Sequence, residues 1–343
     1  MQHWLKEIAR GKRGAKDLSY EEALEAARFI AGGKATDAQL AAFFIAERIK
    51  TESPQELLAF VQAFQEKCEV IKGLNCIQID FAGPYTGRNT FAATIPVSLL
   101  LADYGISVFM HASDSLPPKY GTSIKDIINE LGIEVGKSGP AISEDVKVRK
   151  IGFAHSEQLC NPLQQMRRIR EEIGVRTILN TAEKLLNLSG AQLLMLGAFH
   201  RTAINKMIPT FEGLGYEKVV VVQGEEGSED VPVHRNSFIY VWTKDSLNSY
   251  LINPEDYGLM EEKQEGTLTL KDQCYIIMTI LKGEGDKAYP YYYKQVLLNA
   301  GIRYYYFGIT SSVEEGIRIA KKQLHQKRGL IKLEEWKVGA LAT

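Results

Sequence analysis

The strongest constraint on the fold is a strand–helix–strand pattern in the first third of the chain. Residues 76–83 (CIQIDFAG) and 106–112 (ISVFMHA) are short runs rich in β-branched and aromatic residues, and 95–105 (IPVSLLLADYG) between them is typical of a buried helix. Such a strand, crossover helix and second strand build a parallel sheet. The pattern therefore predicts an α/β fold. Further strand-like runs begin at Lys150, Ala191, Lys218 and Ser237.

The residues before this pattern predict helices only. Three helices are expected to begin at Ser19, Thr36 and Ser53, each of which is a favoured N-cap residue. A polar, arginine-rich helical stretch, 161–188, interrupts the strand-like runs, and we expect it to return to the N-terminal helices. The tail predicts one more helix, capped by Ser312 and ended by Gly329.

Composition and charge exclude several classes of protein. Lys and Arg number 41 and Asp and Glu 42, and this balance argues against a protein that coats nucleic acid indiscriminately. The chain has no N-terminal signal sequence and no run near the roughly 20 apolar residues that span a bilayer. We therefore expect a cytoplasmic protein. The four cysteines are scattered, which favours buried free thiols over a metal or redox site.

Three segments carry a resemblance to a known family. These are the N-terminal run 18–60, the segment 174–180 (GVRTILN) and the segment 219–230 (VVVVQGEEGSED). Together with the order of the elements, they resemble the anthranilate phosphoribosyltransferases over nearly the whole chain. The resemblance implies a small all-helical domain of residues 1–72 plus about 160–188. It also implies a larger α/β domain of residues 73–159 plus 189–343 with a mostly parallel sheet, and a homodimer joined through the helical domains.

The loop that binds the phosphorylated ribose donor in that family is altered here. The family's GTGGDG and TFNIST place glycine N–H groups and a helix N-terminus around a diphosphate. This chain has 82–87 (AGPYTG) and 88–95 (RNTFAATI) instead. Proline removes one of the N–H donors on which such a loop depends. In the next family motif, Met110 stands where the resemblance expects a phosphate-facing lysine.

Several residues of these two loops remain suited to an anion, at the ends of the first strands where ligands of open parallel sheets bind. The predicted anion or donor site consists of Gly83, Gly87, Arg88, Asn89, Thr90, His111, Lys119, Gly121 and Thr122. Each of the three basic residues of this set also has an explanation that does not involve a bound anion. The alternative for His111 is a hydrogen-bonded structural histidine, that for Lys119 is a solvated lysine, and that for Arg88 is a surface arginine.

The resemblance also implies acceptor and metal residues. The family's substrate-carboxylate arginine corresponds to Arg170, and the histidine before it corresponds to Cys160. The family's magnesium-binding acidic pair is present in reversed order as Glu229 and Asp230, and adjacent carboxylates suit a hard cation. The resemblance thus implies magnesium as a cofactor. The alternative for this pair is an exposed acidic turn.

Two functional hypotheses follow from this pattern. A divergent branch of the family has a similar PxYxGR loop and AKL-like turn, matched here by 84–88 and 182–185, and its members are linked to nucleic-acid binding. The segment 318–343 has a net charge of +5, which attracts a phosphate backbone. We therefore predict a protein with a degenerate donor site that binds a phosphorylated small molecule or nucleic acid and does not make phosphoribosyl anthranilate. The alternative is an active phosphoribosyl or pentosyl transferase, including the anthranilate phosphoribosyltransferase of tryptophan biosynthesis.

Overall fold

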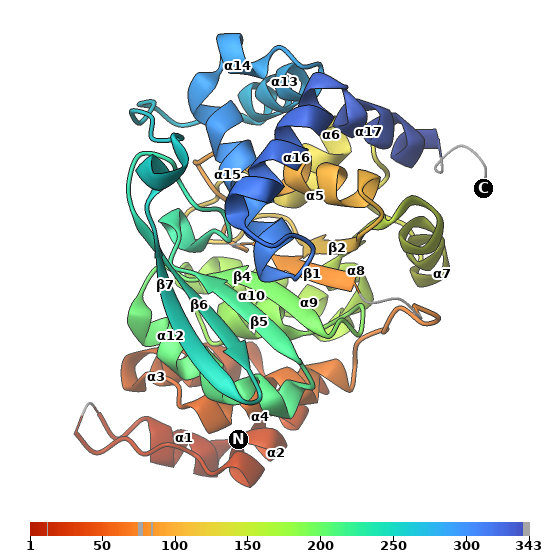
Figure 1. Cartoon of the computed structure of the whole chain (residues 1–343). Helices are drawn as coiled ribbons and strands as arrows, with labels where there is room; N and C mark the ends of the chain where they lie inside the picture. Colours follow the sequence, from red (N-terminus) through yellow and green to blue (C-terminus); the bar gives the residue numbers. More distant parts are fainter. Residues whose placement is uncertain (12, 75–77, 84, 339–343) are drawn as a thin grey trace.

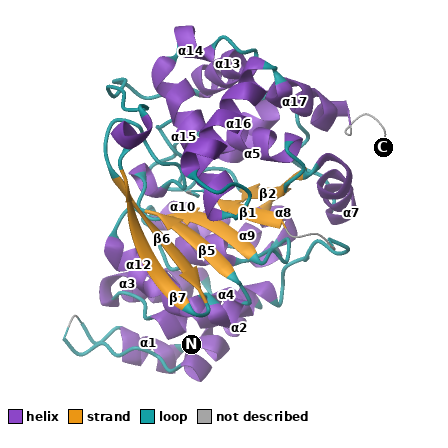
Figure 2. Ribbon diagram, viewed as in Figure 1, coloured by secondary structure: helices purple, strands orange, loops and turns teal. Residues whose placement is uncertain are grey.

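The computed structural model describes residues 1–11, 13–74, 78–83 and 85–338 of the chain. A central sheet is covered on one face by the N-terminal helices and on the other by the C-terminal helices (Figures 1 and 2). The fold is a small helical domain with a larger α/β domain, as the sequence predicts. No helix in the described part of the chain is long and apolar enough to cross a membrane.

The sheet has seven strands in the order β3-β2-β1-β4-β5-β6-β7. The first five in sequence are parallel, and β6 and β7 add an antiparallel edge. The strands are β1 Gln78–Ala82, β2 Ser107–Ala112, β3 Ile151–His155, β4 Leu193–Gly197, β5 Lys218–Val222, β6 Ser237–Thr243 and β7 Ser246–Ile252. Residues 76 and 77 of the predicted first strand lie outside the described residues.

The helices of the lower layer come from two distant parts of the chain. The N-terminal ones are α1 Gln2–Ile8, α2 Tyr20–Ala31, α3 Asp37–Lys50 and α4 Pro54–Gln65. The short helix α8 Ser156–Leu159 precedes the arginine-rich stretch, which contributes α9 Asn161–Gln165, α10 Arg167–Ile173 and α11 Leu179–Ala182. Helix α10 packs on α3 and α11 packs on α4, so this stretch returns to the N-terminal helices as the sequence predicts. Ser19, Thr36 and Ser53 each form a capping box with the residue three positions later.

The remaining helices pack around the α/β domain. They are α5 Thr94–Asp103, α6 Ile124–Glu130, α7 Gly139–Glu144, α12 Arg201–Met207, α13 Leu270–Leu281, α14 Gly285–Ala288, α15 Pro290–Tyr306, α16 Val313–His325 and α17 Arg328–Val338. The prediction of a single tail helix that ends at Gly329 is wrong, because Gly329 lies inside α17. A Cβ there would lie 2.7 Å from Leu281 Cδ2, so the glycine allows α17 to pack closely.

Two hydrophobic cores lie on opposite faces of the sheet. Phe81 of β1 and Met110 of β2 face the core under α5, α13 and α15–α17. Ala82 and Phe109, one residue along, face the core under the helical domain. Side chains alternate between faces along a strand, so the polar residues Asp80 and His111 share the face toward the helical domain. Met110 is therefore a core residue.

Candidate functional site

The loops that follow β1 and β2 cross at the carboxyl end of the sheet. The backbone N–H of Arg88 donates to the carbonyl of Thr122, and the N–H of Thr122 donates back to Arg88, both at 2.9 Å. A Cβ on Gly87 would lie 2.1 Å from the carbonyl oxygen of Gly121, and Gly87 has a φ of 69°. The glycines at 87 and 121, both in the predicted anion site, therefore allow one loop to pass closely over the other.

The crossed loops surround one carboxylate, that of Glu226. Its Oε2 accepts hydrogen bonds from the backbone N–H of Asn89 at 2.8 Å, from that of Thr90 at 3.0 Å and from the Thr90 hydroxyl at 2.9 Å. Its Oε1 forms an ion pair with Lys119. Burial opposes ionisation, but the hydrogen bonds from Lys119 and Thr90 outweigh it and lower the pKa of Glu226. An anion site is thus formed by three of the predicted site residues, Asn89, Thr90 and Lys119. We call it the anion nest, and the carboxylate of Glu226 occupies it.

Arg88 points away from the nest into the protein. Its Nη2 lies 3.0 Å from Glu229 Oε1, and its Nη1 lies 2.8 Å from Asp230 Oδ2. Arg303 of α15 pairs with the other Asp230 oxygen at 2.8 Å. All four side chains are buried. Two cations thus neutralise two carboxylates, and Arg88 is neither a surface arginine nor a ligand of a bound anion.

This cluster corrects both predictions for the acidic pair. Glu229 and Asp230 are not an exposed turn, because both are buried. They also do not fit magnesium in this arrangement, because guanidinium groups already occupy their oxygens. Among the described residues, no group of three or more His, Cys, Asp or Glu is placed to hold a metal ion. Gly83 lies against the cluster, where a Cβ would be 2.8 Å from Arg88 Nη2, so its role is structural.

His111 lies beneath the site in a buried polar chain. Its Nδ1 is 2.5 Å from the Tyr85 hydroxyl, which is 2.6 Å from Ser156 Oγ. Its Nε2 is 3.4 Å from Asp80 Oδ1. Burial lowers the pKa of His111 to about 4, so the ring is neutral near pH 7. The structural alternative for His111 is therefore correct, and the prediction that it lines the anion site is not.

The predicted acceptor residues are also turned away from solvent. Arg170 is buried and forms an ion pair with Glu183. Burial raises the pKa of Glu183 to about 7, against the opposing effect of Arg170. Cys160 is buried, and its backbone pairs with that of Cys68 in an isolated antiparallel β-bridge. Cys160 and Cys274 are buried free thiols, as predicted, Cys68 is partly buried, and Cys76 lies outside the described residues.

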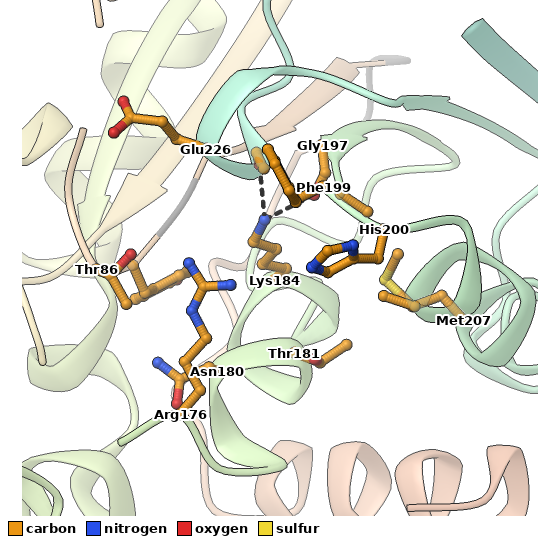
Figure 3. A pocket seen from close by; sticks show the side chains of 14 residues that line it. Thr86, Arg176, Asn180, Thr181, Lys184, Gly197, Phe199, His200, Met207 and Glu226 are labelled. Carbon is orange, nitrogen blue, oxygen red and sulfur yellow. Dashed lines mark hydrogen bonds between the residues drawn. The ribbon is translucent and has the colours of Figure 1, made fainter. Parts of the chain in front are cut away.

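A small pocket opens beside the nest, between the sheet and the helical domain (Figure 3). It has a volume of about 100 Å³. Its lining includes Tyr85, Thr86 and Glu226 on one side and the apolar side chains of Phe199 and Met207 on the other. Two cations that the sequence analysis did not assign to a site, Arg176 and Lys184, complete the wall. Both lie in segments that carry the family resemblance: Arg176 is the arginine of GVRTILN, and Lys184 is the lysine of the turn 182–185.

A second, larger cavity of about 640 Å³ adjoins the pocket, and the two share Phe199, His200 and Glu226. Asn89 and Thr90 of the nest line this larger cavity, together with Arg235 and Lys263. The nest therefore stands between a larger polar cavity and a smaller pocket with apolar and cationic walls. This arrangement suits a site that brings a phosphorylated molecule and a second small molecule together.

The tail carries less free charge than its sequence indicates. Arg328 pairs with Asp103 at 2.7 Å and Lys337 pairs with Glu334 at 2.8 Å. Lys332 pairs with Glu335. These pairs are local or lie on the flank of α5. Glu334 and Glu335 are already counted in the net charge of +5, so among these three pairs only that of Arg328 with Asp103 reduces it.

Comparison with known proteins identifies relatives along the whole chain. Residues 85–329 match the α/β domain of a glycosyl transferase family, and residues 2–68 match the helical bundle domain of that family. An anthranilate phosphoribosyltransferase of Persephonella marina is 29% identical over 98% of this chain and 99% of its own length. One from Acetivibrio thermocellus is 28% identical over 94% of this chain and 92% of its own length.

Solved structures of the same enzyme share the fold. The structure from Thermus thermophilus has a TM-score of 0.83 at 24% identity and covers 98% of this chain and 99% of its own. The structure from Saccharomyces cerevisiae in complex with PRPP and Mg has a TM-score of 0.86 at 16% identity and covers 100% of this chain and 98% of its own.

These findings overturn the hypothesis of a binding protein with a degenerate donor site. Relatives 25–29% identical along nearly the full length are named as anthranilate phosphoribosyltransferases, which favours the alternative of a transferase. The hypothesis of a degenerate site gave most weight to the glycines and the lysine that the loops have lost. Asn89, Thr90 and Lys119, which were kept in the predicted anion site, do gather donors around one anion. The chain belongs to the glycosyl transferase family whose helical bundle and α/β domains match its residues 2–68 and 85–329.

Proposed function

We propose that this chain is a phosphoribosyltransferase that moves a phosphoribosyl group from a diphosphate-activated donor to a small acceptor. The observation that supports this most is the anion nest of Asn89, Thr90 and Lys119. Two successive backbone N–H groups, a hydroxyl and an ammonium converge on one carboxylate. Such concave sets of donors bind phosphate groups as readily as carboxylates. The transfer breaks the bond from ribose C1 to the diphosphate, and donors of this kind stabilise the charge on that leaving group.

In this proposal the two cavities bind the two substrates. The larger one, lined by Asn89, Thr90 and Lys263, suits the donor, whose phosphates need polar and cationic contacts. The smaller one, lined by Phe199 and Lys184, suits the acceptor. The acceptor nucleophile would attack ribose C1 from this side and lose a proton as the new bond forms, while the diphosphate keeps the electron pair of the broken bond.

Magnesium is a candidate cofactor for this reaction, because the Saccharomyces cerevisiae relative is solved with PRPP and Mg. The residues that the sequence assigned to it, Glu229 and Asp230, are taken by Arg88 and Arg303. The proposed transfer therefore relies on the chain's own donors at the nest.

A transfer assay tests the proposal. Purified protein with phosphoribosyl pyrophosphate, anthranilate and magnesium is expected to release diphosphate and to form phosphoribosyl anthranilate, seen as a fall in anthranilate fluorescence. Lys119→Met is expected to lower kcat/KM roughly ten- to hundredfold, because a hydrogen bond to a charged group contributes about 1.5–3 kcal/mol. No diphosphate release above the no-enzyme rate, with either anthranilate or other small aromatic acids as acceptor, would refute the proposal.

We further propose that the protein is a homodimer whose subunits meet through the helical unit of residues 1–72 plus about 160–188. An apolar groove runs between α1 and α3, lined by Ile8, Ala42, Ile45 and Ile49. Ile49 is 61% exposed, which is unusual for a large aliphatic side chain. A second copy packed on this groove would remove it from water. The apolar run 41–45 contributes to this surface only in part, because Phe43 and Phe44 are buried within the subunit.

Light scattering of the purified protein measures the oligomeric state. The wild-type protein is expected to have the mass of a dimer at micromolar concentration, and Ile49→Asp is expected to shift it to the monomer. Ile331→Asp is the matched control, since Ile331 is also exposed, at 44%, but lies on α17. A monomeric wild type, or an Ile49→Asp variant that stays dimeric, would contradict this interface.

A further inference from the structure

Cys68 and Cys160 face each other across two segments that are far apart in the sequence. Their backbones pair in the isolated antiparallel β-bridge. The N–H of Glu69 donates to the carbonyl of Leu159 at 2.7 Å, so the hydrogen bond beside the bridge joins the residue after Cys68 to the residue before Cys160. This pattern makes the two cysteines a non-hydrogen-bonded pair, the kind of antiparallel pair whose Cα atoms lie about 4.5 Å apart and whose side chains are closest.

This arrangement suits a disulfide bond. A disulfide requires Cα atoms roughly 4.4–6.8 Å apart and Cβ atoms that lie close together, and a non-hydrogen-bonded pair supplies both. The two thiols already interact, since the side chains of Cys68 and Cys160 share a hydrogen bond. Cys274 lies on α13 instead, with its Sγ 3.9 Å from the carbonyl oxygen of Ile127. Of these three cysteines, Cys68 and Cys160 are therefore the two that the fold places for a covalent bond.

A small oxidant can reach the pair from the side of Cys68. Cys68 is partly buried and is flanked by the exposed residues Lys67 and Glu69, whereas Cys160 is fully buried. The hydrogen bond with Cys160 and burial both raise the pKa of Cys68. Because the thiolate is the reactive form of cysteine, we expect the pair to react slowly and to stay reduced until an oxidant persists.

The two cysteines lie where the chain passes between the helices of the lower layer and the sheet. Cys68 follows α4 on the way to β1, and Cys160 lies between β3 and α9. They are 92 positions apart, and the chain between them contains β1, β2 and β3. A bond between them would therefore close a long loop and tie the helical layer to three strands of the sheet. Closing a long loop restricts the unfolded chain more than closing a short one.

We propose that Cys68 and Cys160 form a reversible disulfide in the presence of hydrogen peroxide, and that this bond stabilises the fold. The sulfur of Cys68 loses its proton and attacks one oxygen of the peroxide. The O–O bond breaks, the departing hydroxide takes up that proton, and a sulfenic acid forms on Cys68. The sulfur of Cys160 then attacks the sulfur of Cys68, the S–O bond breaks, and a second water leaves with the Cys160 proton. The two sulfurs lose two electrons, which the peroxide gains, and a dithiol reverses the bond by exchange.

Peptide mapping of the oxidised protein tests the proposal without any assay of transfer. Folded protein is treated with hydrogen peroxide, its remaining thiols are alkylated, and it is digested with trypsin. Mass spectrometry is expected to find peptide 68–72 joined to peptide 151–167, two hydrogen atoms lighter than the separate peptides together. Cleavage after Lys67 and Lys72 separates Cys68 from Cys76, so the partner of Cys68 is identified. Dithiothreitol is expected to restore both free thiols.

Two variants and a melting curve complete the test. Cys68→Ser is expected to lack the joined peptide, and Cys274→Ser is the matched control that is expected to retain it. Oxidised wild type is expected to melt roughly 5 °C above reduced wild type, because the bond restricts the unfolded chain, whereas Cys68→Ser is expected to show no rise.

Three outcomes would overturn the proposal. The first is recovery of peptides 68–72 and 151–167 unjoined from treated protein that circular dichroism shows to be folded. The second is a bond from Cys68 to a cysteine other than Cys160. The third is an oxidised wild type that melts no higher than the reduced protein, because the bond would then not stabilise the fold.

Discussion

Replacement of Arg88 by methionine is expected to lower the free energy of unfolding by about 3–5 kcal/mol, because it leaves two buried carboxylates with one cation. Arg88 is 1% exposed and contacts both Glu229 and Asp230. Arg303 pairs with Asp230, so Glu229 would lose the one ion-pair partner that it has among the described residues. Methionine is flexible and fills much of the vacated space, so the expected loss reflects mainly the unpaired charge.

Urea denaturation of the purified variant measures this effect. Arg28→Met provides the matched control, because Arg28 pairs with Glu66 at the surface, where both side chains are about half exposed. Exposed pairs contribute about 0–1 kcal/mol, so the control is expected to resemble the wild type. A free energy of unfolding of Arg88→Met within about 1 kcal/mol of the wild-type value would contradict this prediction, because it would show that the buried carboxylates tolerate the loss of Arg88.

The same variant tests how the acidic pair relates to magnesium. In the absence of donor, magnesium is expected to raise the melting temperature of Arg88→Met and to leave that of the wild type unchanged. In the variant, the oxygens of Glu229 no longer contact the guanidinium of Arg88 and are free to bind the ion. An ion that binds only the folded state raises the melting temperature. A magnesium-dependent rise in the wild type of similar size would show that Arg88 yields its place to the ion.

Replacement of Glu226 by glutamine is expected to strengthen the binding of inorganic diphosphate roughly tenfold. The carboxylate of Glu226 now occupies the nest, with four donors directed to it. A diphosphate that binds there must displace it. Hydrogen bonds to a charged group contribute about 1.5–3 kcal/mol and those between neutral groups about 0.5–1.5 kcal/mol, so a neutral side chain is easier to displace. Loss of the negative charge also removes repulsion of the ligand.

Lys119→Met is expected to weaken the binding of inorganic diphosphate by roughly tenfold or more, since it removes a cation from the nest. Calorimetry with diphosphate measures both variants. Glu217→Gln is the control, because it makes the same change in net charge at an exposed position that lines neither cavity. If Glu226→Gln weakens binding as Lys119→Met does, Glu226 helps to hold the ligand and does not compete with it.

The sequence was sufficient where the determining interactions are local. The helix starts at Ser19, Thr36 and Ser53 depend on a side chain and a backbone N–H three residues apart, and all three are confirmed. The parallel sheet and its layers follow from the period of apolar residues and from the length of the crossovers. The family resemblance, carried by collinear motifs, predicted the fold class and the transferase alternative. The tail helix was misjudged at Gly329, because close packing on Leu281 overrides the tendency of glycine to end a helix.

The candidate site was decided by the tertiary structure. Arg88, Glu226 and Arg170 were recognisable as charged residues near the right motifs, but the sequence does not say which opposite charge each one meets. Arg88 lies 141 positions before Glu229, and Lys119 lies 107 before Glu226. Whether a cation faces a ligand or a carboxylate of its own chain depends on which loops the fold brings together, and burial then makes each pairing strong. For that reason Arg170 is enclosed with Glu183, while Arg176 and Lys184, six and fourteen residues later, line the pocket.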